Sequence, residues 1–427
     1  MDKYIFSKLV VAVAVSSLAL SGCEPKDEFE AQTIVVPDEK PMTIVRVEPD
    51  DGVTRVNSLP KAIEENGDAI YELERGGVYY LEGKNVIKRN VVVRAGNGTG
   101  ELPIIQPISD AQGALNADML RFEGNAVFQN VYISGKDAAS NNIMQRLFRI
   151  DSKNIKLTFE NCFVEYCRNF CIRIDNKNSK IQISNSTFRN ISLTSDPANG
   201  RLIDTRGNAQ DSISITNSTI YNLTGHLIRF NNALTNYLEL RNNTIYNDGF
   251  HMKFDYVMTA YVENNIFADV GWKAGYTTNP SPFWEFKSYT GDNADKQHIV
   301  IRNNNVFTDS RIEALYDKYP DNYKRIGLNS DGTAMIEDGR LTFENNFSEM
   351  LRFDNAPDLP MEYITKFFEV VGAGMSPYAD LPFNVDEDGV EGIHVGQTYT
   401  FNYQASSKSA TASTTGGPIG SGQWRVK

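Results

Sequence analysis

A short phrase built around asparagine recurs along this chain, and it constrains the fold more than any other feature of the sequence. The copies are FQNVYI, FENCFV, ISNSTF, ITNSTI, LRNNTI, VENNIF, IRNNNVF and FENNF. Their first asparagines are Asn130, Asn161, Asn185, Asn217, Asn242, Asn264, Asn303 and Asn345, so successive copies lie 31, 24, 32, 25, 22, 39 and 42 residues apart. A short unit that lengthens where loops are inserted is typical of a stacked solenoid.

The residues around each asparagine indicate β-structure. Apolar and polar residues alternate there, and Ile, Val, Phe and Thr are frequent, as in half-buried strands. Asparagine suits the corner between two strands because it tolerates the left-handed backbone of a sharp turn. An inward asparagine can also hydrogen-bond corner backbone groups and its counterpart in the next coil. We therefore expect a ladder of these asparagines, pointing inward at one corner of about nine to ten coils.

A second phrase follows several of these corners. It reads MLRFE, LFRID, CIRID, LIDTR, LIRFN, HMKFD and FWEFK. Apolar residues flank a polar centre in most copies, which predicts a strand whose centre points outward. The central residues are Arg121, Arg149, Arg173, Asp204, Arg229, Lys253 and Glu285. Strands of neighbouring coils lie about 4.8 Å apart, so we expect these side chains to form one column on the surface.

These repeats resemble those of the pectate-lyase-like right-handed parallel β-helix proteins. Within that group the chain looks most like the branch of chondroitinase B and the alginate lyases, with its related uncharacterised bacterial surface lipoproteins. The stretch SLPKAIEENGDAIYELERGGVYYL, residues 58–81, resembles the capping helix and first coil of that branch, and GGPIGSGQWRVK is similar to a terminal segment of such proteins. The resemblance implies an all-β, single-stranded right-handed parallel β-helix with an N-terminal capping helix and inserted loops.

The N-terminus carries an export signal instead of part of the fold. Lys3 and Lys8 flank the start of an apolar run that is too short to span a bilayer comfortably. The run ends in Leu-Ser-Gly-Cys at Cys23, which resembles the lipobox of bacterial lipoproteins. We expect a lipoprotein signal peptide at 1–22, a tether and leading strands at 23–57, and the β-helix with a C-terminal cap at 58–427. The chain would then be an outer-membrane lipoprotein of a Gram-negative bacterium, exposed at the cell surface and held by its lipid alone.

Charge and cysteine content narrow the classes of partner. The formal net charge is −12 and there is no basic arm, so we expect no nucleic-acid partner. Cys162, Cys167 and Cys171 remain after Cys23, and an exported protein could oxidise one pair of them. No histidine lies among them, which disfavours zinc. We favour three cysteines packed as small buried residues, in a monomeric protein.

The central column suggests chemistry on acidic sugars. Members of the resembled group bind acidic polysaccharides along this outer face, and the chondroitinase branch uses calcium with a lysine and an arginine. A lyase must neutralise a uronate carboxylate, remove the neighbouring proton and protonate the leaving oxygen. By this resemblance Lys253 and Arg229 would act as base and clamp, with His251 close by in the sequence.

Calcium is the cofactor that the resemblance implies. It takes several oxygen ligands, and Asp204, Asp255 and Glu285 are the carboxylates on or beside the column. The family's tight set of acidic and amide ligands on consecutive coils has no clear match in this sequence.

The residues two places beyond each column member favour a simpler interpretation. They are Glu123, Asp151, Asp175, Arg206, Asn231, Asp255 and Lys287, and six of the seven pairs are opposite in charge. Such a face largely compensates itself, since exposed ion pairs contribute about 0–1 kcal/mol each. Arg229 is the exception because Asn231 follows it, which makes Arg229 the best pointer to a bound anion.

The sequence thus predicts a surface lipoprotein that binds a uronic-acid-containing polysaccharide along this column. Arg149, Arg173 and Arg206 would contact its carboxylates, and Trp272 and Tyr276, in the loop before FWEFK, would stack on sugar rings. Two alternatives remain open. One is a calcium-dependent polysaccharide lyase of the chondroitinase B type, which acts by β-elimination. The other is a structural adhesin or spacer.

Overall fold

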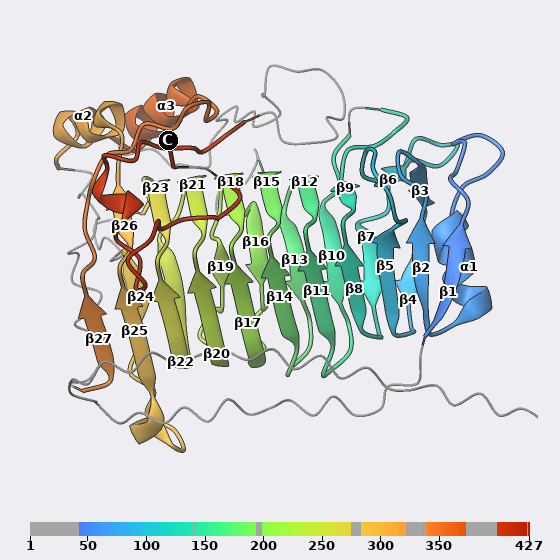
Figure 1. Ribbon diagram of the computed structural model, residues 1–427, viewed down its shortest axis with the longest axis horizontal. Coiled ribbons are helices and arrows are strands. Elements are labelled where there is room, and N and C mark those ends of the chain that lie inside the picture. The colour runs from blue at the N-terminus through green and yellow to red at the C-terminus, as the bar shows by residue number, and fades with distance from the viewer. Residues whose placement is uncertain are drawn as a thin grey trace, which may run out of the picture. The chain divides into compact units, whose positions relative to one another are not determined.

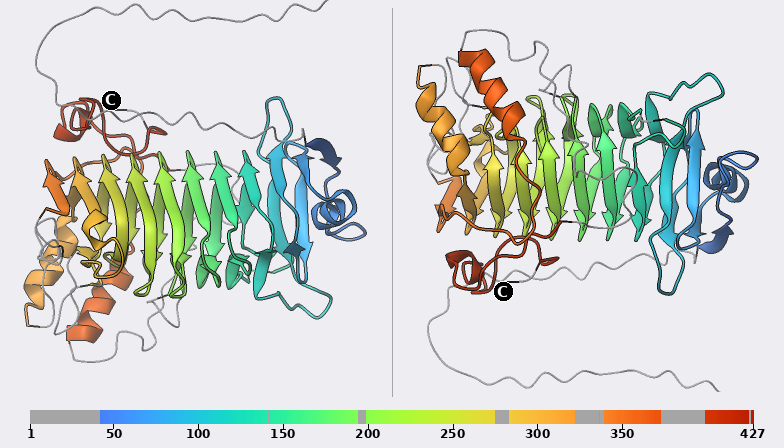
Figure 2. Two further views of the ribbon diagram at one scale, coloured as in Figure 1. Left: turned by 90° about the horizontal axis from the view of Figure 1, so that it is seen from below. Right: turned by 90° about the horizontal axis from the view of Figure 1, so that it is seen from above.

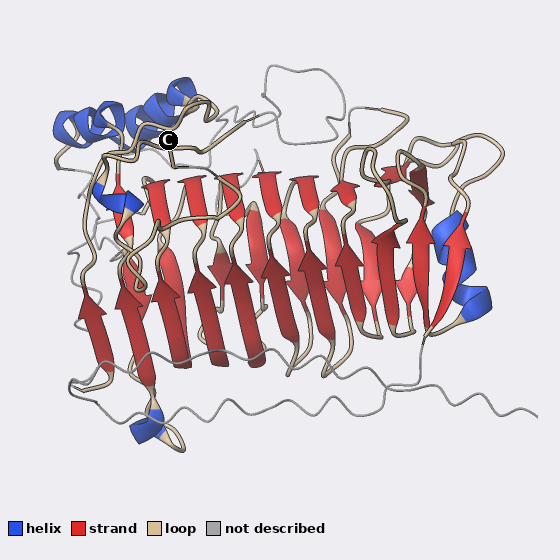
Figure 3. Cartoon of the chain, viewed as in Figure 1, coloured by secondary structure: helices blue, strands red, loops and turns tan. Residues whose placement is uncertain are grey.

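The computed structural model describes residues 42–140, 142–193, 199–274, 283–321, 336, 339–372, 399–424 and 426–427. Residues 42–427 form one compact unit, and in its described parts every paired strand runs parallel to its neighbours, in three sheets (Figure 1). Helices are few and lie outside the sheets (Figure 3). The expected parallel β-helix is therefore confirmed. The predicted signal peptide, Cys23 and Tyr276 lie outside the described residues.

Sheet A runs along the whole described stack. Its order is β1-β2-β5-β8-β11-β14-β17-β20-β22-β25-β27, and β24 pairs with the start of β22. The bounds are β1 Thr43–Val47, β2 Ala69–Leu73, β5 Val91–Ala95, β8 Ala126–Gln129, β11 Lys156–Glu160, β14 Lys180–Ser184, β17 Gln210–Thr216, β20 Leu234–Arg241, β22 Met252–Glu263, β25 His298–Arg302 and β27 Leu341–Glu344. With one strand per coil, the stack is slightly longer than the nine to ten coils expected.

Sheets B and C complete each coil, because successive strands of the chain enter sheets A, B and C in turn. Sheet B, in stacking order, holds β26 Asn305–Phe307, β23 Ile266–Val270, β21 Thr244–Asp248, β18 Thr219–Leu223, β15 Thr187–Ile191, β12 Phe163–Cys167, β9 Tyr132–Ser134, β6 Ile104–Ile108 and β3 Val78–Glu82. Sheet C holds β19 Ile228–Arg229, β16 Arg201–Asp204, β13 Phe170–Ile174, β10 Arg146–Ile150, β7 Asp118–Phe122 and β4 Val86–Ile87. The strand β24, Trp284–Phe286, continues this face beyond β19 and the start of β22.

The interior of the coils is one continuous apolar core. Inward residues of each strand are almost completely buried, among them Phe122, Phe128, Phe148 and Phe159. Neighbouring rings in this group have centroids 4.9 to 6.2 Å apart. Such aromatic pairs add about 0.5–1.5 kcal/mol each beyond the burial of their area. The core therefore fixes which residues of each strand point outward.

The asparagine phrase forms the corner between sheets A and B. All eight first asparagines have positive φ, from 49° at Asn217 to 59° at Asn264, which confirms the expected left-handed turn. Their predicted inward orientation is wrong. Asn161 and Asn345, for example, are exposed. The left-handed residue redirects the chain, so the next side chain, one place later, is the one that points inward.

An inward ladder exists at that next position, in the four later coils. Side-chain amides join Asn243 to Asn265 at 3.0 Å, Asn265 to Asn304 at 2.9 Å, and Asn304 to Asn346 at 2.8 Å. Each of the first three also donates to a backbone carbonyl, at 2.7 to 2.8 Å. These amides satisfy buried corner groups that no strand can pair.

A helix covers the first coil, as the sequence predicts. The helix α1 (Ser58–Asn66) buries Leu59 and Ile63 against the core and lies at the N-terminal end of the stack (Figure 2). Asp50 accepts a hydrogen bond from the Ser58 backbone N–H at 3.2 Å, which satisfies one free donor at the helix start.

The outer face of sheet B carries a second apolar cluster. The helices α2 (Ser310–Lys318) and α3 (Met361–Gly372) contribute Ile312 and Phe367 to it, and the C-terminal segment contributes Phe401. The other helices among the described residues are short 3₁₀ turns at Ala294–Lys296 and Lys408–Ala410. In the described parts of the chain, no helix is long and apolar enough to cross a membrane.

The three cysteines of the stack are free thiols. Cys162, Cys167 and Cys171 are all buried. Burial raises the pKa of the Cys162 and Cys167 thiols to about 12. They act as small packing residues, as favoured from the sequence.

Candidate functional site

The centres of the second phrase form the expected column on the outer face of sheet C. Strand register aligns Arg121, Arg149, Arg173, Asp204 and Arg229, and then Lys253 with Glu285. We call these seven residues the charge column. The residues on either side of each centre point into the core, as Met252 and Phe254 do around Lys253, which is why the centre points outward.

The first three cations of the charge column are compensated by aspartates. The ion pairs are Arg121–Asp151 at 2.5 Å, Arg149–Asp151 and Arg149–Asp175 at 2.7 Å, and Arg173–Asp175 at 2.8 Å. Burial alone would lower the pKa of Arg149, but the surrounding carboxylates raise it above its usual value. The pairing with the residue two places on, which the sequence predicts, holds for Arg149 and Arg173, whereas Arg121 pairs with Asp151 of the next coil instead of Glu123. A ligand that contacts Arg149 or Arg173 must compete with these aspartates.

Arg229 is less well compensated. It donates a hydrogen bond to Asn231 Oδ1 at 3.1 Å, and its ion pair with Asp204, one strand away, spans 4.0 Å. Asp204 is bound more closely by Arg201, at 2.5 Å. The side chain of Arg229 is 30% exposed, so its guanidinium remains accessible to a ligand.

Arg206 flanks the same part of the face. Its side chain is exposed, and its guanidinium lies 5.7 Å from the ring centroid of Phe170. Its backbone N–H donates to Asp204 Oδ1 at 2.8 Å, which fixes the turn that carries Arg206.

A cluster around Glu285 ends the charge column. Glu285 Oε2 lies 2.7 Å from His251 Nε2, and Oε1 lies 3.2 Å from Lys253 Nζ. Lys287, two residues on, approaches Oε1 to 3.7 Å. His251 and Glu285 are buried, whereas the Lys253 and Lys287 side chains are each 30% exposed. Lys287 Nζ also lies 2.7 Å from Oδ1 of the buried Asp255, so two partly exposed ammonium groups stand beside two buried carboxylates.

The protonation of this cluster follows from burial and hydrogen bonding. Burial lowers the pKa of His251, although the hydrogen bond to Glu285 opposes this. Burial alone would raise the pKa of Glu285, but His251 and Lys253 outweigh it and lower that pKa to about 2. A neutral His251 that donates Nε2–H to ionised Glu285 fits both directions. His251 Nδ1 then carries a lone pair, and this buried atom has no hydrogen-bond partner within the described part of the chain.

The carboxylates expected to hold calcium do not form one site. Each already has a cation: Arg201 for Asp204, Lys287 for Asp255 and Lys253 for Glu285. Among the described residues, no group of three or more His, Cys, Asp or Glu side chains is placed to hold a metal ion. Calcium takes about six to eight oxygen ligands, so this donor set does not fit it.

The predicted stacking role of Trp272 is corrected by the structure. Its side chain is 1% exposed and packs edge-on against Tyr363 and Phe367 of α3, with centroids 5.9 and 5.6 Å apart. The ring anchors α3 to the solenoid and cannot reach a ligand. Its partners lie about ninety residues away in sequence, so no local pattern could reveal the packing.

Two tyrosines that the sequence did not assign to ligand binding lie beside the charge column. Tyr256 of β22 and Tyr289, just after β24, meet edge to face with centroids 6.2 Å apart. Both are partly exposed, and Lys287 Nζ lies 5.8 Å from the Tyr256 centroid. The position of Tyr256 directly after the phrase HMKFD was the one sequence signal that placed it near the charge column. Partly exposed rings next to cations suit the apolar faces of charged sugars.

The chain has structural neighbours, but no family model and no curated protein matches it. It is similar to a mutant of the PL6 family alginate lyase AlyGC, with 13% identity and a TM-score of 0.41, over 73% of this chain and 41% of that one. It is also similar to the tailspike protein gp49 of Acinetobacter baumannii bacteriophage Fri1, a capsular polysaccharide depolymerase, with 10% identity and a TM-score of 0.28, over 72% of this chain and 64% of that one. The chain thus spans less than two thirds of either structure.

Proposed function

We propose that this chain binds an acidic, uronic-acid-containing polysaccharide along the outer face of sheet C, with Arg229 and Lys253 as the central contacts. The change of ion pairing along the charge column carries the proposal. Its first three cations lie 2.5 to 2.8 Å from aspartates, whereas Arg229 reaches a carboxylate only at 4.0 Å. An accessible cation without a close counter-ion, on an otherwise compensated face, attracts an anion.

The neighbours of Arg229 support a polymeric ligand. Lys253 lies one coil away, and the exposed Arg206 lies on the other side of Arg229. Lys287 lies beyond Lys253 and is partly exposed, although Asp255 compensates it at 2.7 Å. Strands of successive coils are about 4.8 Å apart, so these cations are spaced as a row instead of a single pocket. Tyr256 and Tyr289 border this row and offer ring faces or edges to sugar carbons. A chain of uronates presents carboxylates and apolar ring faces together.

Titration of a polyuronate into three variants tests this proposal. Arg229→Ala and Lys253→Ala should each weaken binding by about 1–3 kcal/mol, the loss expected for a charge-assisted hydrogen bond. Arg149→Ala is the matched control, because it removes the same charge from the same face at a position where three aspartates compensate it. Equal and negligible effects of all three substitutions at low salt would contradict this proposal. This face would then be only the solvated surface of a sheet, as the spacer alternative requires.

A second candidate, polysaccharide lyase activity, is favoured by the pairing of His251 with Glu285. Elimination needs a neutral base and a cation on the uronate carboxylate. Lys253 is ion-paired with Glu285 at 3.2 Å, whereas burial lowers the pKa of His251 and so favours its neutral form. In this second candidate Arg229 and Lys253 neutralise the carboxylate. His251 Nδ1, which is buried in the free protein, would have to become accessible to take the proton next to the carboxylate, and the protonated imidazole would then give that proton to the leaving glycosidic oxygen. An assay for unsaturated product, with and without a chelator, tests it. Product that disappears in His251→Gln while polymer binding persists would support catalysis.

We also propose that the protein is anchored at the outer-membrane surface through a lipid on Cys23. The apolar run that ends in Leu-Ser-Gly-Cys supports this proposal. The acidic stretch EPKDEFE behind it suits a solvated tether between lipid and β-helix. Such an anchor would present sheet C to polysaccharides outside the cell.

A further inference from the structure

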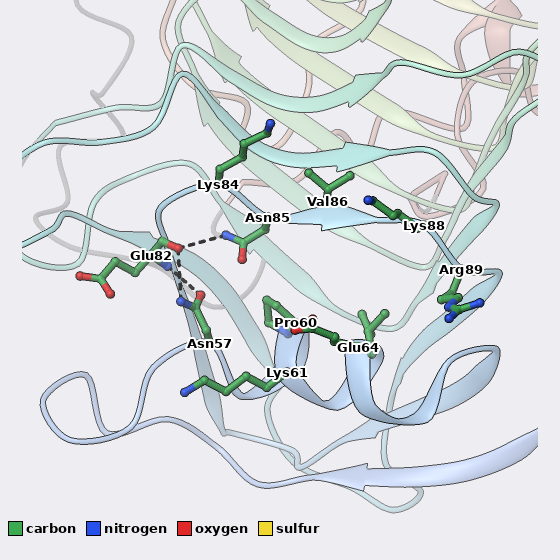
Figure 4. A pocket seen from close by; sticks show the side chains of 11 residues that line it. Asn57, Pro60, Lys61, Glu64, Glu82, Lys84, Asn85, Val86, Lys88 and Arg89 are labelled. Carbon is green, nitrogen blue, oxygen red and sulfur yellow. Dashed lines mark hydrogen bonds between the residues drawn. The ribbon is translucent and has the colours of Figure 1, made fainter.

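A cavity of about 730 Å³ lies at the N-terminal end of sheet C. Its walls come from α1 on one side and from β4 with its flanking turns on the other (Figure 4). Pro60 and Ile63 of α1 and Val86 of β4 supply apolar surface, and Asn57 and Asn85 supply amides. A cavity of this size holds a ligand larger than a single ion, since small-molecule sites are typically about 300–1,000 Å³.

The charge on the lining of this cavity is predominantly positive. Lys84, Lys88 and Arg89 line it, all three are exposed, and none makes an ion pair in the part of the chain that the structure describes. Lys61 adds a fourth cation, and the carboxylates of Glu64 and Glu82 line the same cavity. The charge column differs, because there most cations have aspartates within 3 Å. Four cations against two carboxylates leave the lining of the cavity with a positive balance, which favours an anionic ligand.

The position of the cavity links it to the charge column. β4 is the end strand of sheet C, and Val86 is in register with Arg121, the first column residue. Asn85 and Ile87 direct their carbonyls to β7, where they accept from Arg121 and Glu123 backbone N–H groups. Because strand residues alternate, the Val86 backbone groups face away from β7, at the edge of sheet C. The cavity thus borders the end of the same sheet that carries the charge column.

We propose that this cavity is an end site for the polysaccharide bound along sheet C, and that it takes a uronate-bearing segment of a few sugars. Lys84, Lys88 and Arg89 bind the carboxylates, and Pro60 and Val86 pack against sugar carbons. The inference rests on the proposed function, because both sites take the same ligand class. β4 and Arg229 on β19 are five strand steps apart, about 24 Å at the usual spacing. A long chain bridges the two sites, whereas a trisaccharide fills one at a time.

Calorimetric titrations with an oligouronate trimer and with a long polyuronate test the end site. The variant Lys84→Ala/Lys88→Ala/Arg89→Ala removes its cations, and Lys153→Ala/Lys156→Ala/Lys180→Ala is a control that removes the same charge from exposed positions elsewhere. Circular dichroism checks that both stay folded. We expect the end-site variant to lower the trimer stoichiometry from two to one and to weaken polymer binding about tenfold or more, through lost bivalency. The control variant should do neither.

The outcomes separate the two proposals. If the end-site variant binds trimer and polymer as the wild type does, while Arg229→Ala weakens binding, the end site is overturned and the sheet C proposal stands. If the end-site variant abolishes binding while Arg229→Ala has no effect, the cavity alone is the binding site and the sheet C proposal fails. If the control variant weakens binding as much as the end-site variant, general charge explains the result and the end site is overturned.

Discussion

Replacing Asn265 by alanine should destabilise the β-helix more than any neighbouring substitution at the same corner. Asn265 is fully buried. Its Oδ1 accepts from the backbone N–H and the side-chain amide of Asn243, at 2.9 and 3.0 Å. Its Nδ2 donates to the Leu240 carbonyl at 2.8 Å and to Asn304 Oδ1 at 2.9 Å. Alanine removes all four bonds and leaves their partners buried.

The magnitude follows from these four contacts. A typical hydrogen bond contributes about 0.5–1.5 kcal/mol net, and a buried group left unsatisfied costs about 1–3 kcal/mol. The free energy of unfolding should therefore fall by about 3–5 kcal/mol. Asn242→Ala is the matched control. That side chain is only partly buried and has φ of 56°, so alanine there should cost about 1–2 kcal/mol of backbone strain. Asn242→Gly, which removes the strain, should cost less than Asn242→Ala.

Denaturant titration followed by far-ultraviolet circular dichroism measures these differences. Similar midpoints for Asn265→Ala and Asn242→Ala would refute the argument that the ladder lies one residue after the left-handed turn. A larger loss for Asn242→Ala would restore the arrangement expected from the sequence, in which the first asparagine points inward.

Three further predictions concern protonation, thiols and anchoring. Burial lowers the pKa of both His226 and His251. Below about pH 6.5 the unfolded state therefore binds protons that the folded state does not, so these two histidines should lower the free energy of unfolding as the pH falls. Asp269, whose pKa is raised to about 7 by burial, and Asp248, whose pKa burial also raises, act in the opposite direction. The readout is therefore the difference between the two proteins: between pH 7 and 5, His226→Gln should lose less stability than the wild type, or gain more, as the pH falls. In a Cys23→Ala background the buried thiols should react with an aromatic disulfide reagent only after unfolding, and fast labelling of folded protein would contradict their packing. Cys23→Ala should also move the protein out of the membrane fraction. Retention of this variant in the membrane fraction through a high-salt wash would contradict the proposed lipid anchor.

The repeat itself made much of the fold predictable. Each coil repeats one pattern, so the left-handed asparagines and the outward centres of sheet C could be placed from residue types alone. Asn242 illustrates both the success and the error, because its turn was predicted correctly and its side-chain direction was not. A corner residue in the left-handed region redirects the chain, and a pattern of letters does not show which of two adjacent asparagines then points inward.

The site was less predictable because its partners come from other coils. Asp151 pairs with Arg121 of the preceding coil, and Glu285 joins His251 to Lys253, through contacts that depend on strand register and side-chain direction. Trp272 was misassigned because α3, which buries it, lies far along the chain. The cavity beside β4 left no signal, since exposed lysines are common on any surface and only the fold gathers them around one space.

The most direct test of the central claim compares a polyuronate with the same polymer after its carboxylates have been reduced to alcohols. The wild-type protein and the variant Arg229→Ala/Lys253→Ala are titrated with both polymers at low and high salt. The account predicts that the wild type binds the acidic polymer, that added salt weakens this binding, that the reduced polymer binds far more weakly, and that the double variant loses most of the difference between them. Equal affinity of the wild type for both polymers, or full retention of acidic-polymer binding by the double variant, would contradict it.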